Sequence, residues 1–306
     1  MVVDNLSLET TEPVGTEPGY AGKRKVRNWG PLGYISAPML VLLVLFAGPM
    51  LILAFYSFQE RGRGDEGAWT LANFENVAQP FYAHVALDTV LIAVAAMVVL
   101  LVVAYPVAYV IAFKSGKWEI PFLLMLVLSD ELNPLIRIFA WKTILGRQGL
   151  VNNLLEWLGL IDEPVQWLLF TKFTVVVVLA AGWLPYTVIP IYAAMKTIDR
   201  NLLEAAQDLG SGWWTTFRTI LLPLTAAGFM AAIILVFIPI LSDYAAPTLV
   251  GGTEGVMIAT IIGDEFLERG EWGKGSALTF VLLAISGLLV WLSYKLANVR
   301  RVQAKV

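Results

Sequence analysis

The chain has 306 residues, of which 58% are hydrophobic, and its mean hydropathy is +0.71. A water-soluble domain is only about 45–50% apolar, so these values exclude an ordinary soluble protein. The formal net charge of −3 argues against a nucleic-acid-binding protein, and the absence of cysteine excludes disulfides and thiolate metal sites. The single histidine, His84, cannot form a zinc site on its own, so no metal site is expected. The composition indicates a polytopic membrane protein.

Residues 1–27 are rich in Thr, Glu, Pro and Gly and are predicted to form a disordered cytoplasmic tail. Residues 28–306 are predicted to form one transmembrane domain. The first apolar run is too long for a cleaved signal peptide. A helix needs about 20 mostly apolar residues to span the bilayer. Six segments qualify: Tyr34–Phe58, Leu87–Phe113, Ile120–Trp141, Phe173–Met195, Leu224–Val250 and Ala277–Ala297. Polar residues interrupt the third, which is kept because apolar stretches flank them.

The distribution of Lys and Arg predicts the orientation of these spans, because cytoplasmic loops carry an excess of both. Six alternating spans place 13 of the 21 basic residues on the side of the two termini and 7 on the other side. Both termini and the loop of residues 197–223 are therefore predicted to be cytoplasmic. On the outer side, a short amphipathic surface helix is predicted over Gly149–Gly159 and a second surface or re-entrant helix over Val256–Leu267. In the first of these, apolar residues on one face oppose Asn152, Asn153 and Glu156.

The third span carries a cluster of polar residues near mid-bilayer. Ionisable residues inside spans are costly and are functional candidates by default. Asp130 lies about ten residues into the span, and Asn133 and Arg137 follow at i+3 and i+7, so a continuous helix would place the three on one face. Glu131 would point about a quarter-turn away, and Pro134 is expected to kink the helix.

The fifth span repeats this combination, since Asp243 is followed four residues later by Pro247, which frees a backbone carbonyl. Trp183 and Tyr186 in the fourth span add an aromatic face suited to cation–π contact. Together these residues predict a path for a cationic or hydrogen-bond-donating ligand. A purely structural interpretation also stands, in which Asp130 pairs with Arg137 and Asp243 sits in water near the outer mouth.

The loop of residues 197–223 is predicted to form two short helices that meet at Gly210-Ser211-Gly212. Asn201 is the expected N-cap of the first helix, with Glu204 completing a capping box, and Gly210 suits a left-handed C-terminal cap. Glu204 and Asp208, at i and i+4, place two carboxylates on one face. A structural interpretation, in which these residues only cap and form the helix, stays open at this point.

The pattern of this loop resembles the cytoplasmic loop of ABC importer permeases. The resemblance rests on Glu204-Ala205-Ala206, a Gly four residues later, and the downstream Phe217, Ile220, Leu222 and Pro223. It implies that the loop docks into a separate ATPase subunit. The ATPase-coupling residues expected from it are Glu204, Ala205, Ala206, Asp208, Gly210, Phe217 and Pro223. The chain itself has no GxxxxGK[ST] loop, so no enzyme activity and no bound cofactor are expected, with ATP and Mg held by the partner.

A second resemblance, to the spermidine/putrescine branch of these permeases, is carried by Leu135–Trp141, Gly149–Leu155 and Phe237–Pro239 leading to Asp243-Tyr244. It implies an all-α polytopic protein of six transmembrane helices with the type I importer fold, in a bacterial inner membrane. The implied partners are a second similar permease, two ATP-binding cassette subunits and a periplasmic or lipid-anchored binding protein. The candidate substrate-path residues are Asp130, Glu131, Asn133, Arg137, Trp183, Tyr186, Asp243 and Tyr244.

The chain departs from that branch at Ser129–Pro134, where the branch has an apolar, aromatic and hydroxyl stretch. The expected solute is therefore either polyamine-like or an amino-acid or opine-like conjugate. Two other functions stay open. A proton-coupled secondary transporter would use Asp130, Glu131 and Asp243 as proton carriers, although such carriers are usually built from internal repeats and none is visible here. A structural membrane scaffold would leave the acids inside the spans unexplained.

Overall fold

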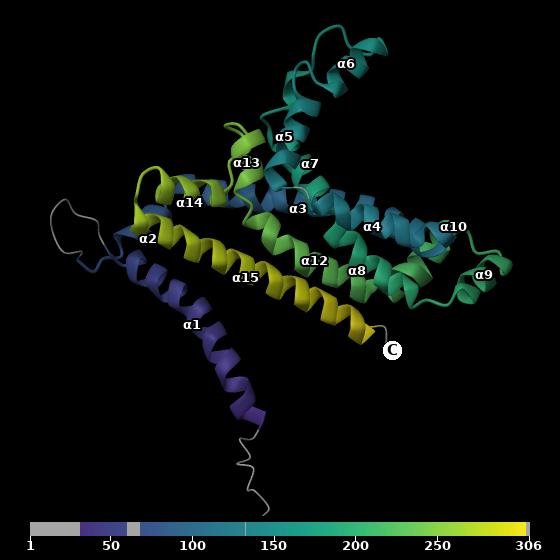
Figure 1. Ribbon diagram of the computed structural model, residues 1–306, viewed down its shortest axis with the longest axis horizontal. Coiled ribbons are helices and arrows are strands. Elements are labelled where there is room, and N and C mark those ends of the chain that lie inside the picture. Colours follow the sequence, from purple (N-terminus) through teal and green to yellow (C-terminus); the bar gives the residue numbers. More distant parts are fainter. Residues whose placement is uncertain (1–30, 60–67, 132, 304–306) are drawn as a thin grey trace, which may run out of the picture. The chain divides into compact units, whose positions relative to one another are not determined.

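The computed structural model of the chain describes residues 31–59, 68–131 and 133–303. The predicted tail, residues 1–27, lies outside this part of the chain. The described residues fall into two compact units that divide between Pro49 and Met50, and the packed helices from α2 onward belong to the second unit. In the described residues, regular secondary structure is helical apart from one isolated antiparallel bridge between Gln59 and Trp69 (Figure 1).

Three single helices are long and apolar enough to cross a membrane. They are α1 (Pro31–Ser57), α3 (Pro80–Tyr109, continued by the π-helical segment η1, Val110–Lys114) and α15 (Trp272–Gln303). Two pairs of consecutive helices are long and apolar enough only when each pair is taken as one bent span. The first pair is α7 (Lys172–Gly182) with α8 (Leu184–Lys196), bent by 49°, and the second is Trp213–Leu224 with α12 (Ala226–Leu241), bent by 67°. By length and composition the described residues thus offer up to five spans.

The third predicted span is two helices rather than one kinked helix: α4 (Glu119–Asp130) and α5 (Pro134–Leu145). Asn133 caps α5, since its Oδ1 accepts a hydrogen bond from the amide of Leu135 at 2.9 Å. Pro134 is the first residue of the helix, where its missing N–H costs nothing. Because the helix stops and restarts, the expected common face of Asp130, Asn133 and Arg137 does not exist.

The fifth predicted span is also interrupted, since α12 ends at Leu241 and α13 (Ala245–Val250) begins after a break that contains Asp243.

Figure 1 shows α6 and α9 far apart within the second unit. The remaining short segments are α2 (Ala72–Val77), η2 (Gly116–Trp118), α6 (Leu150–Trp157), η3 (Gln166–Leu168), α9 (Arg200–Asp208), α10 (Trp213–Thr216), η4 (Phe217–Leu221), α11 (Leu222–Leu224) and α14 (Ile258–Leu267).

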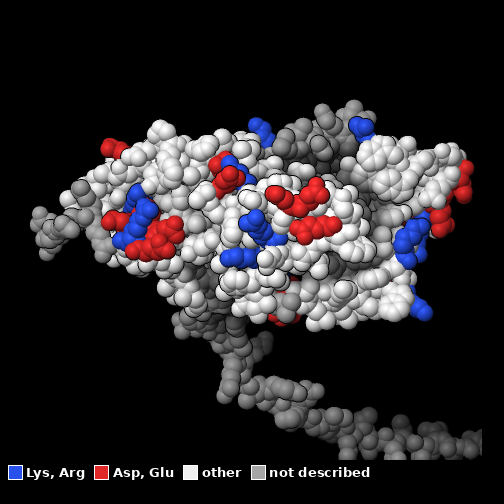
Figure 2. Space-filling view, turned by 90° about the horizontal axis from the view of Figure 1, so that it is seen from above, with Lys and Arg blue, Asp and Glu red and all other residues white. Residues whose placement is uncertain are grey.

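Helix α3 lies at the centre of the second unit and packs against α7, α8 and α12. Its buried alanines, among them Ala93, Ala96 and Ala104, let neighbouring backbones approach closely, as is usual between membrane helices. Polar contacts also tie the bundle together: the hydroxyls of Tyr105 and Thr225 lie 2.9 Å apart. Large uncharged surfaces remain exposed, and charged side chains gather in a few groups (Figure 2). Such surfaces suit lipid or other subunits.

The short helix predicted over Gly149–Gly159 is present as α6, but Asn152 does not lie on its predicted polar face. Its side chain is fully buried, donates to the carbonyls of Gly146 and Val165 at 3.0 and 3.3 Å, and accepts from the amide of Val165 at 2.8 Å. Buried backbone groups need such partners. Asn152 therefore holds the hairpin between α5 and α7 closed. Helix α14 also forms, and its apolar residues Ile258 and Ile261 pack into the core.

Candidate functional site

The breaks in the predicted spans meet at one cavity of about 210 Å³. Side chains of α4, α5, α7 and α8 and of the segment after α12 enclose it. Its lining residues are Asp130, Pro134, Arg137, Ile138, Val178, Leu179, Gly182, Trp183, Tyr186, Asp243 and Ala246. Five of the eight substrate-path candidates are among them. The cavity holds two carboxylates and one guanidinium, so its formal charge is −1.

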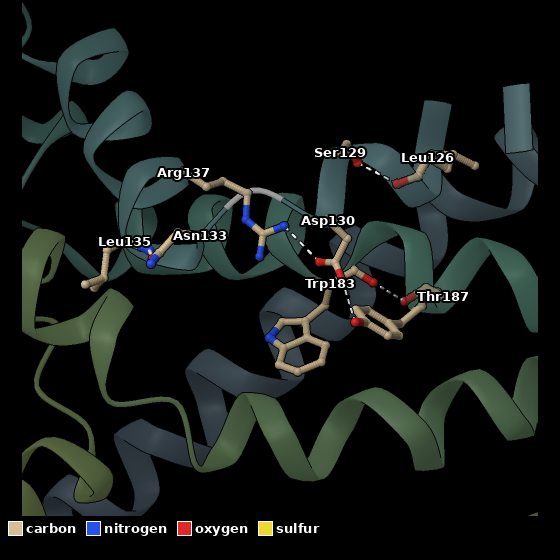
Figure 3. A network of polar contacts seen from close by, with 9 residues as sticks. Leu126, Ser129, Asp130, Asn133, Leu135, Arg137, Trp183 and Thr187 are labelled. Atoms are coloured by element: carbon tan, nitrogen blue, oxygen red, sulfur yellow. Dashed lines mark hydrogen bonds and ion pairs between the residues drawn. The ribbon is translucent and has the colours of Figure 1, made fainter. Parts of the chain in front are cut away.

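Asp130 is held by two partners at the end of α4. Arg137 donates from Nη1 to Oδ1 at 3.0 Å, and the Tyr186 hydroxyl donates to Oδ2. Each of the charged side chains is 23% exposed, so the ion pair is partly shielded from solvent. Figure 3 shows Arg137 and Asp130 pointing toward each other across the gap between α4 and α5. The ion pair between Asp130 and Arg137 that the structural interpretation of the sequence predicted is therefore present, and both residues line the cavity.

The bend between α7 and α8 supplies the aromatic side of the cavity. Trp183 sits at the bend, and its ring centroid lies 5.4 Å from that of Tyr186. Gly182 precedes Trp183 in the chain. A side chain at position 182 would place its Cβ 3.8 Å from Nη2 of Arg137. The guanidinium therefore packs over the backbone of Gly182. Sequence reasoning missed this residue, because only the arrival of Arg137 from another helix gives it a role.

Asp243 reaches the cavity from the break between α12 and α13. Its Oδ1 accepts a hydrogen bond from the amide of Ala246 at 2.9 Å, and it lies close enough to Arg137 to interact electrostatically. The acid thus caps the start of α13 while facing the cavity. The cavity thereby brings together acids from two predicted spans that lie more than a hundred residues apart.

Three candidates do not line the cavity. Glu131 is exposed at the end of α4, and Asn133 is used as the cap of α5. The ring of Tyr244 lies against Gly263 of α14 instead. Of the eight candidate substrate-path residues, five therefore line the cavity: Asp130, Arg137, Trp183, Tyr186 and Asp243.

The cytoplasmic-loop prediction can be compared with α9 and the segments after it. Gly210 has a φ of +80°, and the amides of Gly210 and Ser211 donate to the carbonyls of Gln207 and Ala206 at 2.8 and 2.9 Å. This is the Schellman arrangement, so the predicted left-handed cap is confirmed. The N-terminal cap is Asp199, whose carboxylate accepts from the amide of Asn201 at 2.9 Å. The predicted capping box with Asn201 and Glu204 is therefore wrong.

Helix α9 buries one side and exposes the other. Leu203 is buried with Ile198 and Leu221, next to the π-helical segments η1 and η4. Glu204, Ala205 and Asp208 are exposed on the opposite side, and Ala206 is half-buried. A short, acidic, small-residue face is thus left without a partner in the described part of this chain.

Two further residues of the expected coupling set lie in the connection that follows α9. Phe217 is half-buried, stacks on Trp213 with ring centroids 5.6 Å apart, and meets Tyr105 of α3 edge-on at 5.1 Å. Pro223 is exposed in α11. Phe217 therefore links the loop to the bundle rather than standing on its surface.

Comparison with known proteins identifies the family of this chain. Residues 89–302 match the family described as "Binding-protein-dependent transport system inner membrane component". The chain belongs to this family. It is a permease subunit of an ABC importer, a transport protein of the inner membrane rather than an enzyme.

Individual relatives agree with the family assignment. The chain is 32% identical over 262 residues to the "Spermidine/putrescine transport system permease protein PotB" of Escherichia coli, covering 85% of this chain and 95% of that one. It is 28% identical to the "Inner membrane ABC transporter permease protein YdcU" of Escherichia coli, covering 83% and 85%. A solved bacterial alginate ABC transporter, in complex with its periplasmic protein, contains a similar chain with a TM-score of 0.70 and 18% identity, covering 87% and 93%. The all-helical permease fold expected from the sequence is confirmed.

Proposed function

We propose that this permease imports a small cationic or amine-bearing solute, driven by ATP hydrolysis in a partner subunit and delivered by an extracytoplasmic binding protein. The observation that carries the proposal is the cavity in which Asp130 and Asp243 stand beside the Trp183 and Tyr186 rings. Carboxylates and aromatic faces both attract ammonium groups. Relatives named as spermidine/putrescine permeases support a polyamine-like solute, and an amino-acid or opine-like conjugate is the second candidate.

Arg137 does not contradict a cationic solute. Its guanidinium compensates Asp130 when the cavity is empty, because an unpaired carboxylate in a poorly solvated site is costly. The cavity still carries one net negative charge. A solute ammonium that enters it would restore neutrality, whereas an anion would add to the charge.

The exposed face of α9 supports coupling to an ATPase. Glu204 and Asp208 offer carboxylates to a basic groove, and Ala205 lets another surface approach the backbone closely. In this proposal both termini and α9 are cytoplasmic, and a second, similar permease and two ATP-binding cassette subunits complete the transporter. Membership of the importer family disfavours a proton-coupled secondary transporter.

The test is uptake of radiolabelled putrescine into proteoliposomes that contain the permease with its partner subunits and binding protein. Asp130→Asn and Asp243→Asn should each reduce uptake, while solute binding to the isolated binding protein stays unchanged. Glu131→Gln is the matched control, because it removes a neighbouring carboxylate that does not line the cavity. Wild-type uptake by both cavity variants, or ATP-independent uptake by the wild type, would refute the proposal.

A further inference from the structure

Helices α4 and α8 are joined at two points by the same combination of groups. Each point has a carboxylate from α4, a tyrosine from α8 and a basic side chain. The first is the cavity cluster already described, in which Asp130 accepts from Tyr186 and Arg137 (Figure 3). The second lies at the other end of the same helix pair and is not part of the cavity.

At the second point, Glu119 begins α4 and is held by two residues of α8. The Tyr192 hydroxyl donates to its Oε1, and the Lys196 Nζ lies 2.9 Å from Oε1 and 3.1 Å from Oε2. The hydrogen bond from Tyr192 first, and then the Lys196 ammonium, hold the pKa of this carboxyl below its usual value of 4.5. Glu119 is therefore ionised at neutral pH and paired with a replaceable cation.

The two clusters lie at opposite ends of α4. Asp130 and Glu119 are eleven residues apart on α4, which corresponds to about 16 Å along the helix. The second cluster lies near the start of α9, because Arg200, the first residue of α9, is close enough to Glu119 to act on it as a second cation. A solute moving from the cavity along α4 and α8 toward α9 would reach Glu119 after Asp130.

The basic partners differ in how tightly they are held. The Arg137 side chain is 23% exposed and packs over Gly182, whereas the Lys196 side chain is 42% exposed on a flexible stem. The lysine end of this pair is open to water, so Lys196 can leave Glu119 at a smaller cost than Arg137 can leave Asp130. A free ammonium can then take its place, and the carboxylate never stands uncompensated.

We infer that Glu119 and Tyr192, with Lys196 as a displaceable tethered cation, form a second binding site for the ammonium group of the solute at the cytoplasmic end of its path. This inference rests on the proposed import of an amine. The site exchanges one ammonium for another, so the charge balance is kept throughout.

The experiment compares Glu119→Gln with Lys196→Gln in the same putrescine uptake assay. Glu119→Gln should lower the maximal rate about tenfold, the loss expected when a charge-assisted hydrogen bond becomes a neutral one. The half-saturating concentration should stay the same, because capture occurs on the outer side. Lys196→Gln should raise the rate, because it removes the cation that competes with the solute for Glu119. Lys117→Gln is the control, since it removes a nearby exposed lysine that has no ion pair with Glu119.

A purely structural pair would behave differently. Glu119→Gln and Lys196→Gln would then break the same contact and lower the rate and the melting temperature equally, and this result would overturn the inference. Unchanged uptake by Glu119→Gln would overturn it as well, while leaving amine import intact. If Glu119→Gln gives no folded protein, Tyr192→Phe keeps both charges and removes only the hydroxyl, and it should also slow uptake. Absence of ATP-dependent uptake in the wild type would overturn the proposed function together with the inference.

Discussion

The hairpin between α5 and α7 offers a sharp test, because two adjacent asparagines have opposite environments. Asn152 is fully buried and makes three hydrogen bonds to the backbone of Gly146 and Val165. Asn153 is exposed and makes one long hydrogen bond of 3.4 Å to the carbonyl of Gln148. The two substitutions to alanine remove the same atoms, so any difference between them reports the environment.

Asn152→Ala leaves the half-buried amide and carbonyl of Val165 without their partner, while the carbonyl of Gly146 keeps the amide of Gly149. An unsatisfied buried group costs about 1–3 kcal/mol, and water that enters the hairpin recovers part of this, so the expected loss of stability is about 2–4 kcal/mol. Asn153→Ala should change stability by less than about 0.5 kcal/mol. Because the hairpin connects the helices that carry Arg137 and Gly182, Asn152→Ala should also reduce uptake.

The measurement is thermal unfolding of the purified permease in detergent, with hydrogen exchange of the hairpin amides as a local readout. Asn152→Ala should melt several degrees below the wild type and exchange faster at Val165, and Asn153→Ala should match the wild type. Equal melting temperatures for the two variants would refute the view that Asn152 holds the hairpin closed.

Three further predictions concern coupling, topology and pH. Glu204→Ala combined with Gly210→Asp should abolish uptake and stimulation of the ATPase without loss of folded protein, because a non-glycine residue at a φ of +80° disturbs the end of α9; wild-type transport would contradict the coupling role of α9. A single cysteine at Thr215, which is exposed, should be labelled only from the cytoplasm and one at Asn153 only from outside, in a chain without native cysteine; outer labelling of Thr215 would reverse the orientation. Since the folded pKa of Glu119 is lowered, its stabilising contribution is complete above its usual value of 4.5 and is lost as pH falls below it. The melting temperature of the wild type should therefore exceed that of Glu119→Gln at about pH 6 and converge on it in more acidic buffer, and a constant difference would contradict this.

Part of the protein could be predicted from local sequence, because the physical causes are local. Runs of about 20 apolar residues match the thickness of the bilayer core, so the membrane class follows from their number and length. The end of α9 follows from Gly210, since only glycine readily adopts the left-handed conformation that satisfies the last carbonyls of a helix. Helical periodicity likewise places Glu204 and Asp208, four residues apart, on one face of α9, and both are exposed there.

Other features depend on contacts between segments that are remote in sequence. Periodicity placed Asn152 on the outward face of α6, but the hydrogen-bonding needs of Gly146 and Val165 turn it inward. Helical spacing placed Asn133 beside Asp130, but the cap of α5 uses Asn133 and breaks the helix. The pairing of Glu119 with Tyr192 crosses 73 residues and leaves no local pattern. Composition therefore set the environment of this chain, while the satisfaction of polar groups across the packed bundle decided which of them meet in the cavity.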